Sequence, residues 1–161
     1  GNTIKDYGHM FKAEPAYADK ARRVAAITRD VTEFVDMLDL PQQPSRGMIV
    51  AYHAACSLQH GQKVTVQPRA LLRKAGFSVR DPGEGHLCCG SAGTYNMLQS
   101  EIADQLKARK VRNIEAVKPD VIAAGNLGCI TQIGSATQIP IVHTVELLNW
   151  AYGGQKPPAL K

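Results

Sequence analysis

The stretch Met48-Ile49-Val50-Ala51-Tyr52 is short and continuously apolar, and it decides the fold prediction for the whole chain. Short apolar runs are typical of strands buried on both faces of a parallel sheet. Similar runs lie at 77–79, 121–124 and 139–142, and helical patterns separate or follow them at 67–75, 94–117, 130–136 and 145–152. Strands that alternate with helices form βαβ units. The sequence therefore predicts an α/β fold: a four-stranded, mainly parallel sheet flanked by helices in a Rossmann-like, three-layer arrangement, with Pro140 indicating an edge strand.

The region before the first strand is predicted to be one long N-terminal helix at 15–39. Pro15 suits its first turn, and apolar residues recur at spacings of three and four, namely Val24, Ile27, Val31, Phe34 and Leu38. The weakest part of this pattern, and the place for a break, is 28–32. Because the chain opens like the interior of a protein, we expect residues 1–44 to link from a missing upstream domain and residues 45–161 to form the α/β domain.

Composition narrows the class of protein. The chain has 161 residues, of which 44% are hydrophobic, and this suits one domain with an aliphatic core. The sequence shows neither a signal peptide nor a run of about 20 apolar residues, so a soluble, intracellular protein is expected. The net charge of +5 is scattered and has one denser run, which consists of Lys107, Arg109, Lys110 and Arg112. With Tyr95 as the only aromatic residue nearby, this run indicates a solvated helix face rather than a nucleic-acid site or a docking patch for an acidic partner.

The cysteines carry the functional signal. Cys56 follows the first predicted strand, Cys88 and Cys89 follow the second, and Cys129 follows the third. The carboxyl ends of parallel strands open on one edge of a sheet, where ligands of such folds bind. The four thiols are therefore predicted to converge, and four thiolates favour zinc or an iron–sulfur cluster. The spacing lacks the C-x₂₋₄-C pairs that are usual for zinc, so a cluster is the favoured interpretation.

Other interpretations of the cysteines remain open at this point. They are a structural zinc site, a dithiol or vicinal disulfide at Cys88-Cys89, and ordinary buried thiols. Glycines between 81 and 93 allow the adjacent pair to reach one site from a turn. His53, His86 and Gly90 are predicted to donate hydrogen bonds to sulfur rather than to bind the metal. No group of residues indicates a catalytic site for substrate chemistry.

Three blocks of sequence resemble a known family. They are Tyr52-His-Ala-Ala-Cys56-Ser-Leu-Gln-His-Gly61, His86-Leu-Cys-Cys-Gly-Ser-Ala-Gly-Thr-Tyr95, and Lys118-Pro-Asp-Val together with Asn126-Leu-Gly-Cys129-Ile-Thr-Gln132. The chain resembles the cysteine-rich CCG domains of heterodisulfide reductases and of lactate-utilisation iron–sulfur proteins. It is most similar to the C-terminal part of glycolate oxidase iron–sulfur subunits, and the resemblance covers nearly the whole chain.

The resemblance implies an electron-transfer domain of a flavin-linked glycolate, or 2-hydroxyacid, dehydrogenase or oxidase complex. Cys56, Cys88, Cys89 and Cys129 would bind an iron–sulfur cluster, and the chain itself would perform no substrate chemistry. Expected partners are a flavin-containing glycolate-oxidising subunit, the other subunits of the complex, and upstream ferredoxin-type and first CCG domains. The expected location is the cytoplasm, with at most peripheral association at the inner face of the membrane, and no nucleic acid is expected to bind.

One departure from the family pattern concerns the metal. The fuller pattern ends in C-x-x-C, whereas this sequence has Gln132 at the last position. A fifth thiolate is therefore absent, which counts against an unusual non-cubane cluster. An ordinary four-thiolate cluster of the [4Fe–4S] kind or a structural zinc ion in a docking module remains compatible with the residues.

Overall fold

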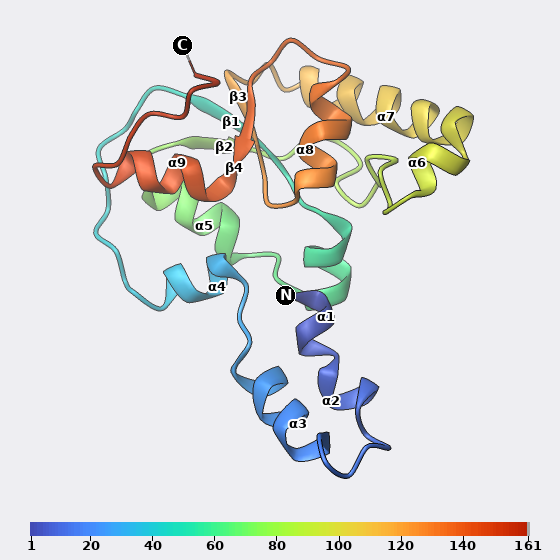
Figure 1. The fold of residues 1–161 in the computed structure, drawn as a ribbon. Coiled ribbons are helices and arrows are strands. Elements are labelled where there is room, and N and C mark those ends of the chain that lie inside the picture. The colour runs from blue at the N-terminus through green and yellow to red at the C-terminus, as the bar shows by residue number, and fades with distance from the viewer. Residues whose placement is uncertain (161) are drawn as a thin grey trace.

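The structure is a computed structural model that describes residues 1–160. Its centre is a four-stranded sheet in the order β2-β1-β3-β4, in which every neighbouring pair is parallel. The strands are β1 (Ile49–His53), β2 (Ser78–Arg80), β3 (Val121–Ala124) and β4 (Ile141–His143). The predicted parallel α/β sheet is thus confirmed, and β4 lies at an edge (Figure 1).

Helices cover both faces of this sheet. On one face lie α5 (Gln67–Lys74) and α9 (Thr144–Ala151), and on the other lie α7 (Ser100–Glu115) and α8 (Leu127–Gly134) (Figure 1). Side chains along a strand alternate between faces, so Val50 and Tyr52 join the core under α5 and α9, whereas Ala51 joins the core under α7 and α8. This arrangement confirms the three layers.

Three helical segments differ from the prediction around the carboxyl edge of the sheet. The expected helix at 94–117 is interrupted at Gln99, whose φ of −132° and ψ of 53° are not helical, and so a short α6 (Tyr95–Leu98) precedes α7. α8 begins earlier than expected because the side chain of Asn126 caps it by accepting a hydrogen bond from Cys129 N. An unpredicted π-helix, η1 (Ser57–Gln62), follows Cys56 directly.

The expected single N-terminal helix at 15–39 is wrong. The structure has α1 (Asn2–Lys5), α2 (Tyr7–Met10), α3 (Ala18–Ile27) and α4 (Val31–Asp36). α3 and α4 are separate because Asp30 is extended and caps α4: its carboxylate accepts from Thr32 N, and the Glu33 carboxylate accepts from Asp30 N. This capping box starts a new helix at a point where the apolar spacing alone predicted continuity.

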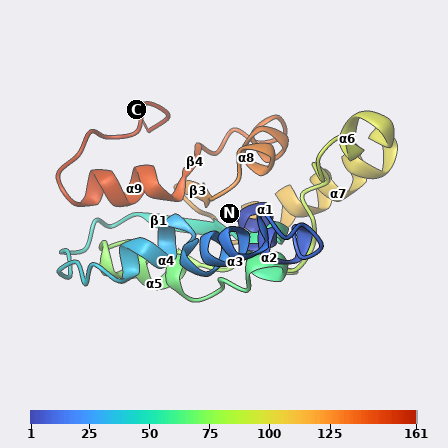
Figure 2. The same ribbon diagram turned by 60° about the horizontal axis from the view of Figure 1, so that its bottom comes forward.

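The N-terminal helices contact the α/β body at two places. α4 packs beside α5 and adds Val35 to the core, and α1 packs beside η1. α1, α2 and α3 lie together (Figure 2), and Lys5 joins α1 to the start of α4 through a 2.6 Å ion pair with Glu33. The apolar stripe predicted for this region is exposed rather than buried at Val24, Ile27, Val31, Phe34 and Leu38. Over the described residues, every helix is too short or too polar to cross a membrane.

Candidate metal centre

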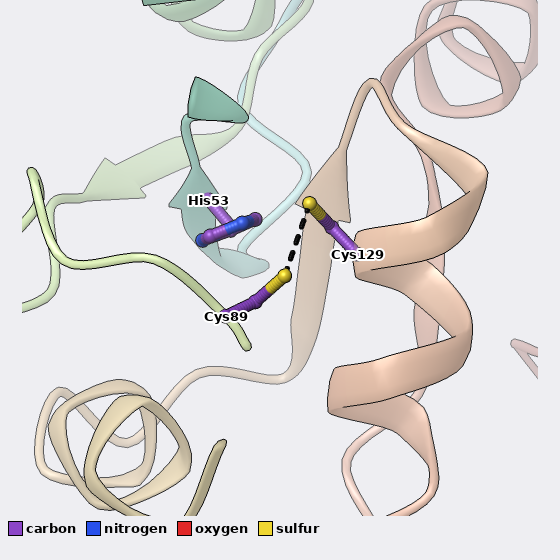
Figure 3. Close-up of side chains that lie close together, drawn as sticks. All are labelled: His53, Cys89 and Cys129. Atoms are coloured by element: carbon purple, nitrogen blue, oxygen red, sulfur yellow. Dashed lines mark hydrogen bonds between the residues drawn. The ribbon is translucent and has the colours of Figure 1, made fainter. Parts of the chain in front are cut away.

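Three elements deliver side chains to one point at the carboxyl edge of the sheet. His53 is the last residue of β1, Cys89 lies in the loop that follows β2, and Cys129 lies in the first turn of α8, after β3. All three residues are buried, and one potential ligand atom from each lies within 4.8 Å of the other two. The side chains point toward one another (Figure 3). The fold thus brings together residues that are far apart in the sequence.

The two thiols of this group, which we call the His53–Cys89–Cys129 cluster, are in direct contact. Their sulfur atoms lie 3.3 Å apart. Two thiolates bound to one tetrahedral ion, with metal–sulfur bonds of about 2.3 Å, would lie about 3.8 Å apart. The two sulfurs would therefore have to move apart only slightly to bind a soft metal. Nε2 of His53 is buried and has no hydrogen-bond partner within residues 1–160. A buried nitrogen without a partner beside two thiols is a donor set that fits a zinc-type or iron-type centre.

Electrostatics in the cluster favour one negative charge on the pair of sulfurs. The hydrogen bond with Cys129 lowers the pKa of Cys89, and the neighbouring imidazole of His53 acts in the same direction. The same hydrogen bond, together with burial, raises the pKa of Cys129. The pair therefore shares one proton, and binding of a metal ion would displace that proton because the thiolate is the form that coordinates.

The remaining two cysteines lie closer to solvent. Cys88 is half-buried, and its sulfur accepts a 3.3 Å hydrogen bond from Gly90 N, while burial raises the pKa of its thiol. Cys56 is exposed immediately before η1, yet its charge contributes to the raised pKa values of Cys88 and Cys129. The structure thus brings two of the four predicted ligands, Cys89 and Cys129, into direct contact. Cys56 and Cys88 lie close enough to influence the pKa of Cys129.

Glycine is required at the turn that carries the adjacent cysteines. Gly90 has a φ of +90°, and a Cβ at this position would lie 2.4 Å from the carbonyl oxygen of Ala103 in α7. The turn therefore packs directly against the backbone of α7, with the Gly90 N–H directed at sulfur as the sequence predicts for this residue. His86, in contrast, is exposed and lies outside the cluster.

The glycine-rich loop is tied to α7 through one glutamate. The Glu84 carboxylate accepts hydrogen bonds from Arg109 and Asn113, and its backbone carbonyl accepts a 2.9 Å bond from Lys110 Nζ. The interpretation of the basic run as a solvated helix face is wrong for Lys110, which is only 1% exposed, whereas Arg109 and Arg112 are exposed as expected. The spacing of 103, 110 and 114 would have placed Lys110 on the buried face of α7, beside Ala103 and Ile114.

Two further residues add detail to the sequence interpretation. His53 was predicted to donate a hydrogen bond to sulfur, and a hydrogen bond from its side chain is among the influences that lower the pKa of Cys89. One of its ring nitrogens also lies within 4.8 Å of both sulfurs, so it could alternatively serve as a ligand. Its position as the last residue of a buried strand was the available signal. Gln132, which stands where the fuller family pattern has a cysteine, is buried, and its Oε1 accepts a 3.2 Å hydrogen bond from Asn96. That position therefore ties α8 to α6 and offers no sulfur.

Comparison with known proteins gives consistent matches. A family model described as a cysteine-rich domain, CCG, matches residues 50–134, which is more than half of the chain. The glycolate oxidase iron-sulfur subunit of Escherichia coli (strain K12) is 38% identical over 152 residues, which cover 94% of this chain and 37% of that protein. Lactate utilization protein A of Bacillus licheniformis is 33% identical over 154 residues, which cover 91% of this chain and 65% of that protein.

The same kind of match extends to Geobacillus thermodenitrificans, whose lactate utilization protein A is 30% identical over 158 residues. The chain thus spans between about a third and two thirds of the length of these relatives. The matched residues 50–134 include the His53–Cys89–Cys129 cluster as well as Cys56 and Cys88. On the sequence blocks, the fold and this match together, the chain belongs to the CCG family of cysteine-rich domains.

Proposed function

We propose that this chain is an electron-transfer domain whose cysteines hold an iron–sulfur cluster. The observation that carries the proposal is the buried His53–Cys89–Cys129 cluster, in which two sulfurs are in contact beside an unpartnered imidazole nitrogen. Cys89 and Cys129 would be the inner ligands, and Cys88 and Cys56 would complete a four-thiolate set from the solvent side. When bound, such a cluster supplies reversible one-electron transfer.

The protein's own contribution is to set the environment of that cluster. Burial of Cys89 and Cys129 excludes water, and the Gly90 N–H donates to the sulfur of Cys88. Hydrogen bonds to sulfur and low exposure are the features by which proteins adjust the reduction potential of a cluster. In this proposal the oxidation of substrate belongs to a different subunit.

The proposed biological setting follows from the names of the relatives. One relative is an iron-sulfur subunit of glycolate oxidase, and others are lactate utilization proteins. We therefore assign the chain to a complex that oxidises a 2-hydroxyacid, with a flavin-containing subunit as electron donor and upstream ferredoxin-type and CCG domains as neighbours. In this assignment residues 1–44 link those domains to the CCG domain at 45–161, and the complex works in the cytoplasm or at the inner face of its membrane.

A structural zinc ion is the second candidate. The close approach of two sulfurs and one imidazole nitrogen, all within 4.8 Å of one another, resembles the ligand set of a single tetrahedral ion. In this case the domain would be a docking module, and the metal would stabilise the fold rather than carry electrons.

Metal and sulfide analysis of protein purified without oxygen separates the two candidates. The wild-type chain is compared with Cys129→Ser and with Thr131→Ala, a control on the exposed side of α8. The iron–sulfur proposal predicts iron with sulfide and an EPR signal after reduction, both lost in Cys129→Ser and kept in Thr131→Ala. Stoichiometric zinc without sulfide supports the second candidate, and protein that binds neither metal overturns both.

A further inference from the structure

A lysine side chain is buried beside the cysteine centre. Lys110 lies on α7, is 1% exposed, and is among the largest fully buried side chains of the described residues. Its Nζ donates a 2.9 Å hydrogen bond to the carbonyl oxygen of Glu84, in the loop that leads to Cys88 and Cys89. Lys110 and His53 also line the same small cavity. The ammonium group thus lies against the loop that leads to Cys88 and Cys89, and it shares a cavity with His53.

This buried cation lacks a carboxylate partner. Within residues 1–160, no carboxylate oxygen of an Asp or Glu side chain lies within ion-pair distance of Lys110 Nζ. Two acidic residues of the neighbouring loop are already engaged, since the Glu84 carboxylate binds Arg109 and Asn113, and Asp81 binds Arg69. Lysines are almost never fully buried unless they are paired, because an uncompensated charge in the interior is costly. The lysine therefore requires another source of negative charge.

The cysteines provide that source. Burial lowers the pKa of Lys110, while negative charge on Cys89, Cys88 and Cys129 acts against this shift, and Cys89 acts more strongly than Glu84. Negative charge on three of the four proposed ligands thus acts on the same ammonium group. Their thiolates would be most negative when all are deprotonated to hold a metal, and the interaction is strong in a buried site because the effective dielectric constant is low.

We propose that Lys110 is the counter-cation of the metal centre, and that its charge compensates the thiolates of Cys88, Cys89 and Cys129 when they hold a metal ion or cluster. The inference rests on the proposed metal centre and adds a residue to it that the cysteine pattern does not include. Lys110 is a positioning and charge-compensating residue and not a ligand. Its charge favours metal binding, and it favours the reduced state of a cluster, because reduction adds a negative charge nearby.

The proposal predicts opposite effects with and without metal. The metal-free chain carries less thiolate charge than the metal-bound chain, because coordination requires the thiolate form, so removal of the Lys110 charge leaves the free energy of unfolding unchanged or raises it. In the metal-bound chain the same substitution leaves thiolate charge uncompensated and weakens binding. A lysine that acted only as a packing or loop-anchoring residue would destabilise both forms when replaced.

Binding of Cd²⁺ to the 161-residue chain tests this, followed through the thiolate-to-metal charge-transfer absorbance. Lys110→Gln removes the charge but keeps an N–H donor for Glu84 O, Lys110→Met removes both, and Lys110→Arg keeps the charge. Lys107→Gln is the matched control, because it removes the same charge from the same helix at a side chain paired with Asp104. We expect Lys110→Gln and Lys110→Met to bind Cd²⁺ at least about tenfold more weakly, Lys107→Gln to bind as the wild type does, and Lys110→Arg to recover most of the affinity.

The outcomes separate the inference from the proposed function. If the wild-type chain binds Cd²⁺ and Lys110→Gln binds it equally tightly, the counter-cation role is wrong while the metal centre stands. If only Lys110→Met is impaired, the hydrogen bond to Glu84 is what matters, and the charge is not. If the wild type binds no Cd²⁺, the metal centre itself is wrong, and the role of Lys110 is lost with it. A metal-free Lys110→Gln chain that no longer folds also contradicts the proposal.

A second readout applies to protein that holds an iron–sulfur cluster. The midpoint potential, measured by redox titration with EPR, should be lower in Lys110→Gln than in the wild type, and unchanged in Lys107→Gln. A tenfold change in the equilibrium between oxidised and reduced cluster corresponds to about 59 mV for one electron. An unchanged potential in Lys110→Gln would contradict the proposal even if the affinity for Cd²⁺ fell.

Discussion

The two faces of the sheet are built differently. The core under α5 and α9 is formed by apolar side chains such as Leu72 and Leu147, which are completely buried. The core under α7 and α8 contains Cys89 and Cys129 among its buried members and is bordered by the charged Lys110. Apolar burial stabilises a fold without specific partners, whereas buried sulfur and ammonium groups require them. The first face therefore supplies stability, and in the proposed function the second face uses part of its interior to bind a metal.

The largest expected effect concerns the first face. Leu147→Ala leaves a cavity in the apolar core and should lower the free energy of unfolding by about 2–5 kcal/mol. The measurement is chemical denaturation, and the control is Val66→Ala, since Val66 is 67% exposed and should change stability little. Metal content per folded molecule should stay at the wild-type value, and a loss of metal in folded Leu147→Ala would show that the two faces are not separable in this way.

A smaller effect is expected at the turn that joins the second face to α7. Gly90→Ala introduces a Cβ against the carbonyl oxygen of Ala103 and also strains a φ of +90°, so it should lower the free energy of unfolding by about 1–3 kcal/mol, toward the upper end of that range. Gly93→Ala is the matched control, because its φ is +67° and nothing lies near its Cβ position. Chemical denaturation should give a lower free energy of unfolding for Gly90→Ala than for Gly93→Ala. Metal binding should weaken only in Gly90→Ala. Equal stabilities would show that close packing against α7 is unimportant.

The smallest effect is expected for Glu84, the half-buried residue that ties the same loop to α7. Hydrogen bonds from Arg109 and Asn113 lower the pKa of Glu84 from 4.5 to about 2. The ionised form is therefore favoured in the folded state, and this stabilisation is present above pH 4.5 and is lost as the pH falls toward 2. Glu84→Gln should be slightly less stable than the wild type at pH 7, and thermal unfolding should show the difference closing in acid. The exposed Glu14→Gln serves as control, and a difference that is constant with pH would contradict the assignment.

Much of the fold could be predicted because the strands are short apolar runs that each end near a glycine, a histidine or a cysteine. The predicted run 48–52 differs from β1 by one residue at each end. The helices were less predictable, since apolar spacing continues across positions where the backbone does not. Asp30 starts a new helix through its own carboxylate, and Gln99 interrupts another through its backbone angles. A side-chain cap such as that of Asp30 overrides the periodicity of the neighbouring residues.

The position of the site at the edge of the sheet could be predicted, but the burial of its individual cysteines could not. Parallel topology alone puts the residues after β1, β2 and β3 at one edge, and this placed the cysteines. Which of them are buried depends on how the loops pack, and so the exposure of Cys56 and the contact of Cys89 with Cys129 emerge only in three dimensions. Lys110 was overlooked because charge in a basic run suggests solvent, although its spacing placed it on the inner face of α7.

The four cysteines form a gradient from the solvent inward, and this has a consequence for how an ion is delivered. Cys56 is exposed, Cys88 is half-buried, and Cys89 and Cys129 are closed off from water. A carrier that exchanges its cargo by thiol-to-thiol transfer can touch the outermost sulfur but has no access to the innermost pair. Loading would therefore run in one direction, from Cys56 inward, and a chain without Cys56 would be filled slowly even where its finished centre was sound.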